Sequence, residues 1–147
     1  MDLILWRHAD AIDGVPDIER TLSKKGKHQA ETAAIWLLPK LRPEAKLWVS
    51  PSMRTRQTAD ALKRPYKIID ALYFKQDPAH IIDITGWPDA QEQIILVGHQ
   101  PTLSLIITKL TRKNCNEVRK GSVWWLHTDH HAQAKIDDVY PPSLKPD

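Results

Sequence analysis

The chain has 147 residues, of which 41% are hydrophobic and 27% charged, a composition typical of one globular domain. Its 21 basic and 18 acidic residues leave a formal charge of +3, which suits an anionic substrate but gives no argument for nucleic acid. No stretch approaches the roughly 20 apolar residues of a membrane span. The apolar start is broken by Arg7, unlike a signal peptide, and a single cysteine excludes an internal disulfide. We expect one cytoplasmic domain over residues 1–147, with a Pro-rich surface tail from about residue 141 and with neither nucleic acid nor a membrane as partner.

The first predicted strand runs from Leu3 to Trp6, and an Arg–His pair follows it directly. A short unbroken apolar run of this kind is typical of a parallel strand buried on both faces. Loop residues occupy positions 13–17, and Ser23 is then the expected N-cap of a helix that Pro39 ends. The buried face of that helix is predicted to consist of Ala30, Ala33, Ala34, Leu37 and Leu38.

A second short strand is predicted over residues 47–49, with a helix directly after it. Ser50 is the expected N-cap of this helix and Pro51 its first residue, because proline suits the first helical position. The helix is expected to end near Pro65, since the residue before a proline is biased away from helical backbone. The unit therefore repeats the strand–helix order of the first.

A weaker strand at 66–69 and a short helix at 78–85 come next, followed by the clearest buried strand of the middle region at 93–97. Pro101 then opens another helix. Residues 122–139 favour two strands about a turn, an antiparallel hairpin at one edge of the sheet. This alternation predicts the α/β class: a single three-layer domain with a mainly parallel sheet, helices on both faces and an antiparallel edge hairpin.

Polar side chains follow three of the predicted strands at their carboxyl ends. Arg7 and His8 follow the first strand, Arg54 lies soon after the second, and His99 follows the strand at 93–97. Ligands of open α/β sheets bind beyond the carboxyl ends of the strands. We therefore expect these four side chains to form one site.

Two histidines and two arginines allow a metal site or an anion pocket. His8 and His99 lack an HExxH or CxxC companion, and arginines are poor neighbours for a cation. His127, His130 and His131 lie in a predicted turn and are interpreted as solvated loop residues. We expect neither a metal nor another cofactor.

An anion pocket fits the four residue types better. Arginine presents a rigid fork of donors to phosphate oxygens. A neutral imidazole can attack phosphorus and form a phosphoryl-histidine, and nearby positive charge keeps it neutral. The two arginines and a second, protonated imidazole would then neutralise charge on the phosphoryl group during transfer.

Three segments in register resemble the histidine phosphatase superfamily: Arg7-His8 after a strand, residues 50–59 (SPSMRTRQTA) and residues 97–101 (VGHQP). The short length and two further segments resemble its compact branch, the SixA-like phosphohistidine phosphatases. These two segments are residues 20–26 (RTLSKKG) and 121–126 (GSVWWL). The resemblance implies a phosphoglycerate mutase-like fold and a metal-independent phosphatase.

The resemblance also implies a role for each matching position. His8 corresponds to the nucleophile that becomes phosphorylated, and Arg7 and Arg54 correspond to the two arginines of the phosphate pocket. His99 corresponds to the second pocket histidine, which contacts the phosphoryl group and helps to stabilise the transition state. Arg20 matches a position near the pocket mouth in the compact branch and is expected to bind phosphate there.

Two positions depart from the family pattern. Ala9 replaces the usual glycine after the Arg–His pair, so the turn cannot use a glycine-only conformation without strain. The glutamate general acid of the larger branches has no clear match. Asp10, Asp17 and Asp77 are near enough in sequence to be considered, but a solvated loop carboxylate is our interpretation of each.

The missing acid bears on the substrate. An alkoxide leaving group needs a positioned acid, worth about 10²–10⁴-fold in rate, whereas phosphohistidine can leave as neutral imidazole once its ring is protonated. The chain also lacks long insertions that would enclose a small molecule. We therefore expect an enzyme that forms a phosphohistidine intermediate and hydrolyses phosphohistidine on a protein. The alternatives are a phosphomonoesterase or mutase acting on a small phosphorylated metabolite, and a non-catalytic phospho-binding module on the same fold.

Overall fold

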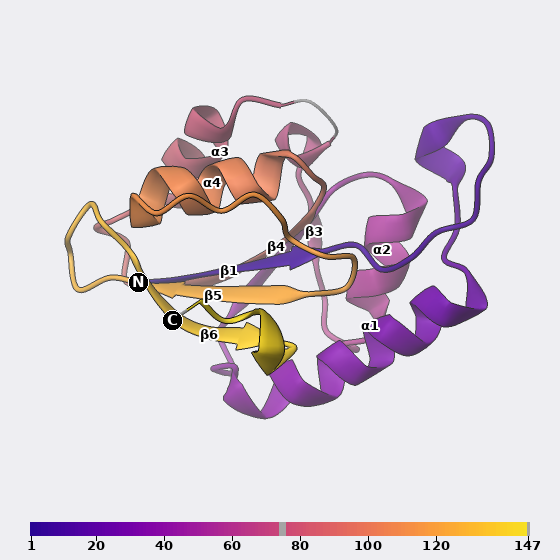
Figure 1. Cartoon of the computed structure of the whole chain (residues 1–147), viewed down its shortest axis with the longest axis horizontal. Helices are drawn as coiled ribbons and strands as arrows, with labels where there is room; N and C mark the ends of the chain where they lie inside the picture. Colours follow the sequence, from indigo (N-terminus) through magenta and orange to yellow (C-terminus); the bar gives the residue numbers. More distant parts are fainter. Residues whose placement is uncertain (74–75, 147) are drawn as a thin grey trace.

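A six-stranded sheet runs through the middle of the molecule in the order β3-β2-β4-β1-β5-β6 (Figure 1). The computed structural model describes residues 1–73 and 76–146. Its strands are β1 (Asp2–Arg7), β2 (Lys46–Val49), β3 (Lys67–Ile68), β4 (Gln93–Gly98), β5 (Val123–His127) and β6 (Lys135–Tyr140). Its helices are α1 (Lys24–Leu37), α2 (Met53–Asp60), α3 (Pro78–Thr85) and α4 (Thr102–Thr111). Short 3-10 turns lie at Asp17–Glu19, Leu38–Lys40, Asp70–Leu72 and Pro142–Leu144.

The sheet combines a parallel part with an antiparallel edge. β1 pairs in parallel with β4, and β2 pairs in parallel with both β3 and β4. β5 runs antiparallel to β1, and β6 antiparallel to β5, so the C-terminal hairpin closes one edge. Helices α1 and α2 cover one face of the sheet, and α3 and α4 cover the other (Figure 1). The predicted three-layer α/β fold with a mainly parallel sheet is confirmed.

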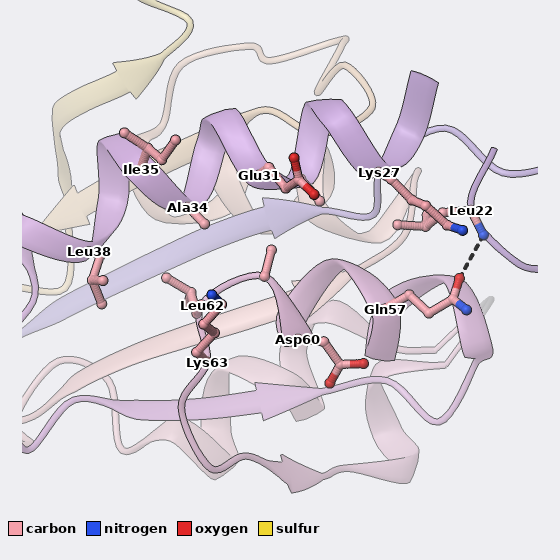
Figure 2. A pocket seen from close by; sticks show the side chains of 12 residues that line it. Leu22, Lys27, Glu31, Ala34, Ile35, Leu38, Gln57, Asp60, Leu62 and Lys63 are labelled. Carbon is pink, nitrogen blue, oxygen red and sulfur yellow. Dashed lines mark hydrogen bonds between the residues drawn. The ribbon is translucent and has the colours of Figure 1, made fainter. Parts of the chain in front are cut away.

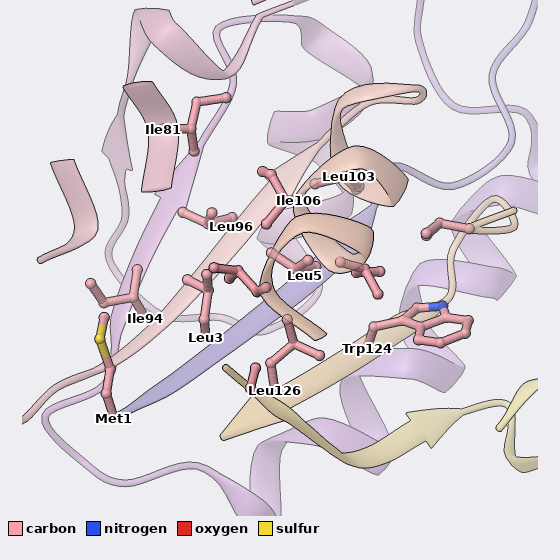
Figure 3. Packing of buried hydrophobic residues seen from close by; sticks show 14 of the residues in the cluster. Met1, Leu3, Leu5, Ile81, Ile94, Leu96, Leu103, Ile106, Trp124 and Leu126 are labelled. Carbon is pink, nitrogen blue, oxygen red and sulfur yellow. The ribbon is translucent and has the colours of Figure 1, made fainter. Parts of the chain in front are cut away.

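Strand β1 is buried on both faces, as its apolar run predicts. Leu3 and Leu5 point to the α3–α4 side and pack in one cluster with Leu103 of α4 (Figure 3). Ile4 and Trp6 point to the opposite side and pack with residues of α1 and α2. All four β1 side chains are fully buried, and burying a side chain of this size contributes about 1.5–3 kcal/mol. The strand is therefore a rigid support for the residues that follow it.

Helix α1 begins where the sequence predicts. The Ser23 side chain accepts a hydrogen bond from the Gly26 backbone N–H at 3.0 Å and caps the helix. Gly26 also lies directly against the backbone of Asp10, because a Cβ at this position would overlap the Asp10 carbonyl oxygen. The chain segment after β1 is therefore pressed onto the first turn of α1.

Helix α2 begins later and ends earlier than predicted. Its N-cap is Ser52, whose Oγ accepts from the Thr55 N–H at 3.3 Å, and its last residue is Asp60. The prediction that Ser50 caps this helix is wrong, because its Oγ lies 2.8 Å from Nε2 of His99 and is hydrogen-bonded there. Pro51 therefore precedes the N-cap residue and is not the first residue of the helix.

The remaining elements agree with prediction more closely. Helix α3 spans the expected residues and ends at Gly86, which has a φ of 79°. In the Pro-rich tail, Leu144 packs against the core, so this tail is not wholly a surface segment. Within residues 1–73 and 76–146, no helix has the length and apolar character needed to cross a membrane.

Candidate functional site

His8 follows β1, and its ring is oriented by the next residue. Its Nδ1 lies 2.7 Å from the Ala9 carbonyl oxygen, so Nδ1–H donates there and the Nε2 lone pair is left free. The Ala9 N–H in turn donates to Oγ1 of Thr58 at 3.0 Å. Ala9 is not among the non-glycine residues with positive φ, so alanine fits this turn without the strain that the sequence suggests.

His8 is held in its neutral form. Burial, together with the charges of Arg54, Arg7 and Lys120, lowers the pKa of His8 from 6.5 to about 4, against the opposing hydrogen bond to Ala9. The expected like-charge effect is therefore present, but desolvation is the larger cause. At neutral pH the Nε2 atom carries an available lone pair.

His99 lies beside His8, with 5.4 Å between the ring centroids. The Nη2 of Arg54 lies 3.3 Å from Nδ1 of His99 and donates to it, which leaves Nε2–H to donate to Ser50 Oγ. Burial, followed by the charge of Arg54, lowers the pKa of His99 to about 3. This neutral state differs from the protonated imidazole that we expected, because the neighbouring cations and the loss of water both disfavour its charge.

Arg7 is positioned by the segment that leads into β5. Its Nη1 donates to the Val118 carbonyl at 2.9 Å, and the Gly121 N–H lies 3.1 Å from the carbonyl oxygens of both Arg7 and His8. The charges of Arg7 and Arg54 act on both histidines. The structure thus brings together the four residues predicted from three strand ends.

Two donors of this pocket are buried and face no acceptor in the part of the chain that the structure describes. They are the Nε atoms of Arg7 and Arg54. A buried N–H without a partner costs free energy, about 1–3 kcal/mol, so both donors are available to a ligand that supplies an acceptor.

Asp17, interpreted from the sequence as a solvated loop carboxylate, is only half-exposed and also contacts the pocket. Its Oδ2 accepts from Nη2 of Arg54 at 3.1 Å and from the hydroxyl of Tyr73 at 3.1 Å, while its backbone oxygen accepts from Nη1 of Arg54 at 2.9 Å. The side chain is still 48% exposed. Asp17 is therefore a pocket residue, and its 37-residue separation from Arg54 gives no sequence signal for this contact.

The two other carboxylates have structural partners. Asp10 accepts from Ser23 Oγ at 2.7 Å and pairs with Lys120 at 3.1 Å. Asp77 caps α3 by accepting from the Ala79 N–H at 3.0 Å.

Arg20 reaches the pocket through Asp17. Its Nη1 lies 3.2 Å from Asp17 Oδ1, and its Nε donates to the Ile12 carbonyl at 2.9 Å. The expected position near the pocket mouth agrees with this geometry, while its binding of phosphate stays a prediction. Tyr73, which no sequence pattern indicates, lies edge-on to His99 with 5.8 Å between ring centroids.

Two hollows lie near these residues and differ in character. A groove of about 660 Å³ runs between α1 and α2 and includes neither histidine nor either arginine of the pocket (Figure 2). At one end of this groove the Leu22 N–H donates to Gln57 Oε1 at 2.7 Å. A second cavity, of about 460 Å³, is adjacent to the pocket because Arg7 lines both; its other lining residues are Asp10, Lys25, Gln29, Glu117, Arg119 and Lys120.

No cluster of three histidine, cysteine, aspartate or glutamate side chains suited to a metal ion occurs among residues 1–73 and 76–146. His127, expected to be solvated, is instead hydrogen-bonded to Asp2 at 2.6 Å and to Asp129 at 3.0 Å. The expectation of a metal-free enzyme remains a prediction.

The fold and pocket agree with a known family. The model of the histidine phosphatase superfamily (branch 1) matches residues 3–73, which include three of the four pocket residues. The chain belongs to this superfamily. It is 29% identical over 107 residues to a protein of Mycobacterium leprae, covering 71% of this chain, and 30% identical over 104 residues to one of Mycobacterium tuberculosis, covering 68%. The chain spans about two thirds, 66%, of the length of each.

Solved structures narrow the relationship. A protein from Nakamurella multipartitia assigned as phosphohistidine phosphatase SixA is 25% identical, with a TM-score of 0.83 over 96% of this chain and 95% of that one. The protein histidine phosphatase SixA, solved with tungstate, is 21% identical, with a TM-score of 0.80 over 99% and 100%. A phosphoserine phosphatase of Entamoeba histolytica shares the fold at 13% identity, with a TM-score of 0.74 over 94% and 95%. Within the superfamily, the chain is SixA-like.

Proposed function

We propose that this protein is a phosphatase that transfers a phosphoryl group to His8 and then to water, and that its substrate is phosphohistidine on another protein. The observation that carries the proposal is the orientation of His8. Its Nδ1–H is bound to the Ala9 carbonyl, so Nε2 offers a lone pair next to Arg54 and His99. A neutral, oriented imidazole is the form that attacks phosphorus.

The neighbouring side chains suit the charge that develops during transfer. The guanidinium groups of Arg7 and Arg54 present donors to the phosphoryl oxygens, and their buried Nε–H groups can donate to these oxygens as well. His99 hydrogen-bonds one of these oxygens through Nδ1 once it gains a proton. Burial is the main reason that the pKa of His99 is lowered to about 3, and the charge of Arg54 adds to it; the dianionic phosphoryl group favours protonation because its negative charge offsets that positive charge.

The surroundings of the pocket support a protein-borne substrate. The cavity beside Arg7, about 460 Å³, is lined by Lys25, Arg119 and Lys120 among other polar residues, and it has room for part of the chain that carries the phosphohistidine. The likeness to SixA proteins, one of them 25% identical, supports the same substrate class. Neither nucleic acid nor a membrane is part of the proposal.

The test compares substrates and traps the intermediate. Purified protein is given a protein carrying phosphohistidine and, separately, a panel of small phosphate esters, and initial rates are compared. Faster release from phosphohistidine is expected, together with an acid-labile phosphoryl label on the enzyme that disappears in His8→Ala. His28→Ala is the matched control, because His28 is an exposed histidine on α1, and it should keep the label.

Two outcomes would overturn the proposal. Faster turnover of a phosphoserine ester or another small metabolite would replace the substrate, and tight phosphate binding with no label on wild-type protein would indicate a binding module. Turnover is expected to survive excess chelator, because the cationic pocket is unsuited to a metal ion. A strict metal requirement would contradict the mechanism.

A further inference from the structure

Residues 10–23 form an arm with Asp17 at its tip, and hydrogen bonds at several points fix the position of this arm. An isolated bridge joins Ala11 to Leu22, and Leu22 is bound to Gln57 of α2. Arg20 further fixes the arm through the Ile12 carbonyl. The arm therefore holds Asp17 against Arg54 in a definite place.

The carboxylate of Asp17 is ionised at neutral pH. Burial works to raise its pKa, but hydrogen bonds from Arg20, Arg54 and Tyr73 and the charge of Arg54 outweigh burial and lower the pKa overall. Among the ion pairs of the described residues, Asp17 is the only carboxylate paired with Arg54. A negative group thus lies in a pocket that otherwise consists of two arginine cations and two neutral histidines.

This placement sets Asp17 in competition with a substrate. Nη2 of Arg54 contacts the Asp17 carboxylate, whereas Nη1 contacts the Asp17 backbone carbonyl, so the carboxylate holds a donor that a phosphoryl group requires. The phosphoryl group repels the carboxylate, which is half-exposed and can rotate away from Arg54 toward the pocket mouth. Arg20 can keep its hydrogen bond to Asp17 during such a movement, since it binds the other carboxylate oxygen, Oδ1.

We propose that Asp17 is the residue that recognises the leaving group, and that it selects a protonated imidazole by accepting a hydrogen bond from the ring nitrogen remote from phosphorus. This role rests on the proposed function and specifies the substrate further. A carboxylate next to the ring favours the cationic phosphoimidazole over the neutral one. An ionised Asp17 gives no such help to an alkyl ester, whose leaving oxygen needs a proton that Asp17 does not carry.

The transfer step balances without a proton donor. The lone pair of His8 Nε2 forms a bond to phosphorus, and the bond from phosphorus to the substrate nitrogen breaks. The electron pair of that bond returns to the substrate nitrogen, so the imidazolium ring becomes neutral imidazole. The proton on the remote nitrogen stays in place throughout, hydrogen-bonded to Asp17. In the second step the oxygen of water bonds to phosphorus, the bond from phosphorus to His8 Nε2 breaks with its electron pair returning to Nε2, and the proton of water leaves with inorganic phosphate or to solvent.

The test measures how one substitution changes kcat/KM for each of two substrates. Asp17→Asn removes the charge at nearly constant size, and kcat/KM is determined with a phosphohistidine peptide and with p-nitrophenyl phosphate, whose leaving group departs without a proton. We expect a loss of about 10- to 100-fold on the peptide, as for one charge-assisted hydrogen bond. The kcat/KM with p-nitrophenyl phosphate should rise, because Arg54 is no longer paired with a carboxylate.

Glu19→Gln is the matched control, since Glu19 is exposed in the same 3-10 turn and should leave both rates unchanged. Tyr73→Phe should shift the substrate ratio in the same direction as Asp17→Asn by a smaller factor. Equal losses of Asp17→Asn on both substrates, or no loss on the peptide, would overturn the role of Asp17. A wild-type enzyme that fails on phosphohistidine but hydrolyses esters would instead overturn the proposed function, and the role of Asp17 with it.

Discussion

A histidine attacks phosphorus only through a nitrogen that carries a free lone pair, and His8 satisfies this requirement in two ways. Its Nδ1 is committed to the Ala9 carbonyl, and its lowered pKa keeps Nε2 unprotonated. Both effects come from the end of β1: the strand buries the ring, and the turn after it supplies the carbonyl. Ala9 makes this turn without positive φ, which explains why glycine is not needed.

The pH behaviour of His8 follows from this environment. We expect the His8 ring to stay neutral as the pH falls through the usual histidine value of about 6.5 and to gain a proton only near pH 4. Nuclear magnetic resonance titration of the imidazole nitrogens measures this directly. A midpoint at or above the usual value would contradict the account, because burial and the neighbouring cations should lower the pKa of His8.

Arg54 is expected to act through the shape of its guanidinium as well as its charge. Arg54→Lys keeps the charge but loses the two-nitrogen fork, and we expect kcat to fall by about 10²-fold, as for the loss of one pre-organised donor. Steady-state kinetics with either substrate checks this. Arg56→Lys, on the same helix, is the control, and a comparable fall there would show a general effect on α2.

The sequence predicts the pocket residues to different degrees, for a physical reason. The arginines and histidines lie within a few residues of strand ends, and the parallel sheet brings those ends to one edge. Asp17 and Tyr73 lie in irregular segments, where no periodicity determines the direction of a side chain. Their contact across the pocket depends on how two loops fold onto the sheet, which local sequence does not specify.

At the scale of elements, the start of α2 illustrates how tertiary contacts override a local pattern. Ser50 and Ser52 both match the N-cap preference, and they flank a proline that suits a helix start. Ser52 caps the helix because the hydroxyl of Ser50 is hydrogen-bonded to His99. At the start of α1 the Ser23 hydroxyl donates to Asp10 and still accepts from the Gly26 N–H, so the predicted cap is confirmed.

Gly26 is expected to be required by packing and not by backbone conformation. Alanine favours a helix by about 1 kcal/mol over glycine, yet we expect Gly26→Ala to lower the free energy of unfolding by about 1–3 kcal/mol, as for overpacking. The cause is overlap of the new Cβ with the Asp10 carbonyl. Urea denaturation measures the change, with Lys27→Ala at an exposed position of α1 as the control. A more stable Gly26→Ala protein would contradict this expectation and show that the arm can move away from the new Cβ at little cost.

At the scale of the whole molecule, the two ends of the sheet carry different kinds of charge cluster. The carboxyl end of β1 holds the cationic pocket, and its amino end holds Asp2, which is buried and bonded to His127 and Gln93. These bonds connect β1 to both neighbours, β5 and β4. The amino-end cluster therefore stabilises the junction between the parallel sheet and the hairpin, at the end of β1 remote from the pocket.

The Asp2–His127 pair gives stability a pH dependence that activity should not share. Hydrogen bonding to Asp2 raises the pKa of His127, so the contribution of its charged form is fully present below about 6.5 and is lost as the pH rises through the folded value. His127→Gln should therefore lower the free energy of unfolding more at about pH 5.5 than at about pH 8.5. Urea denaturation at both values, with exposed His28→Gln as the control, measures the difference, and phosphatase assays should show little change. Equal losses at the two pH values would mean that His127 stabilises the hairpin by packing alone.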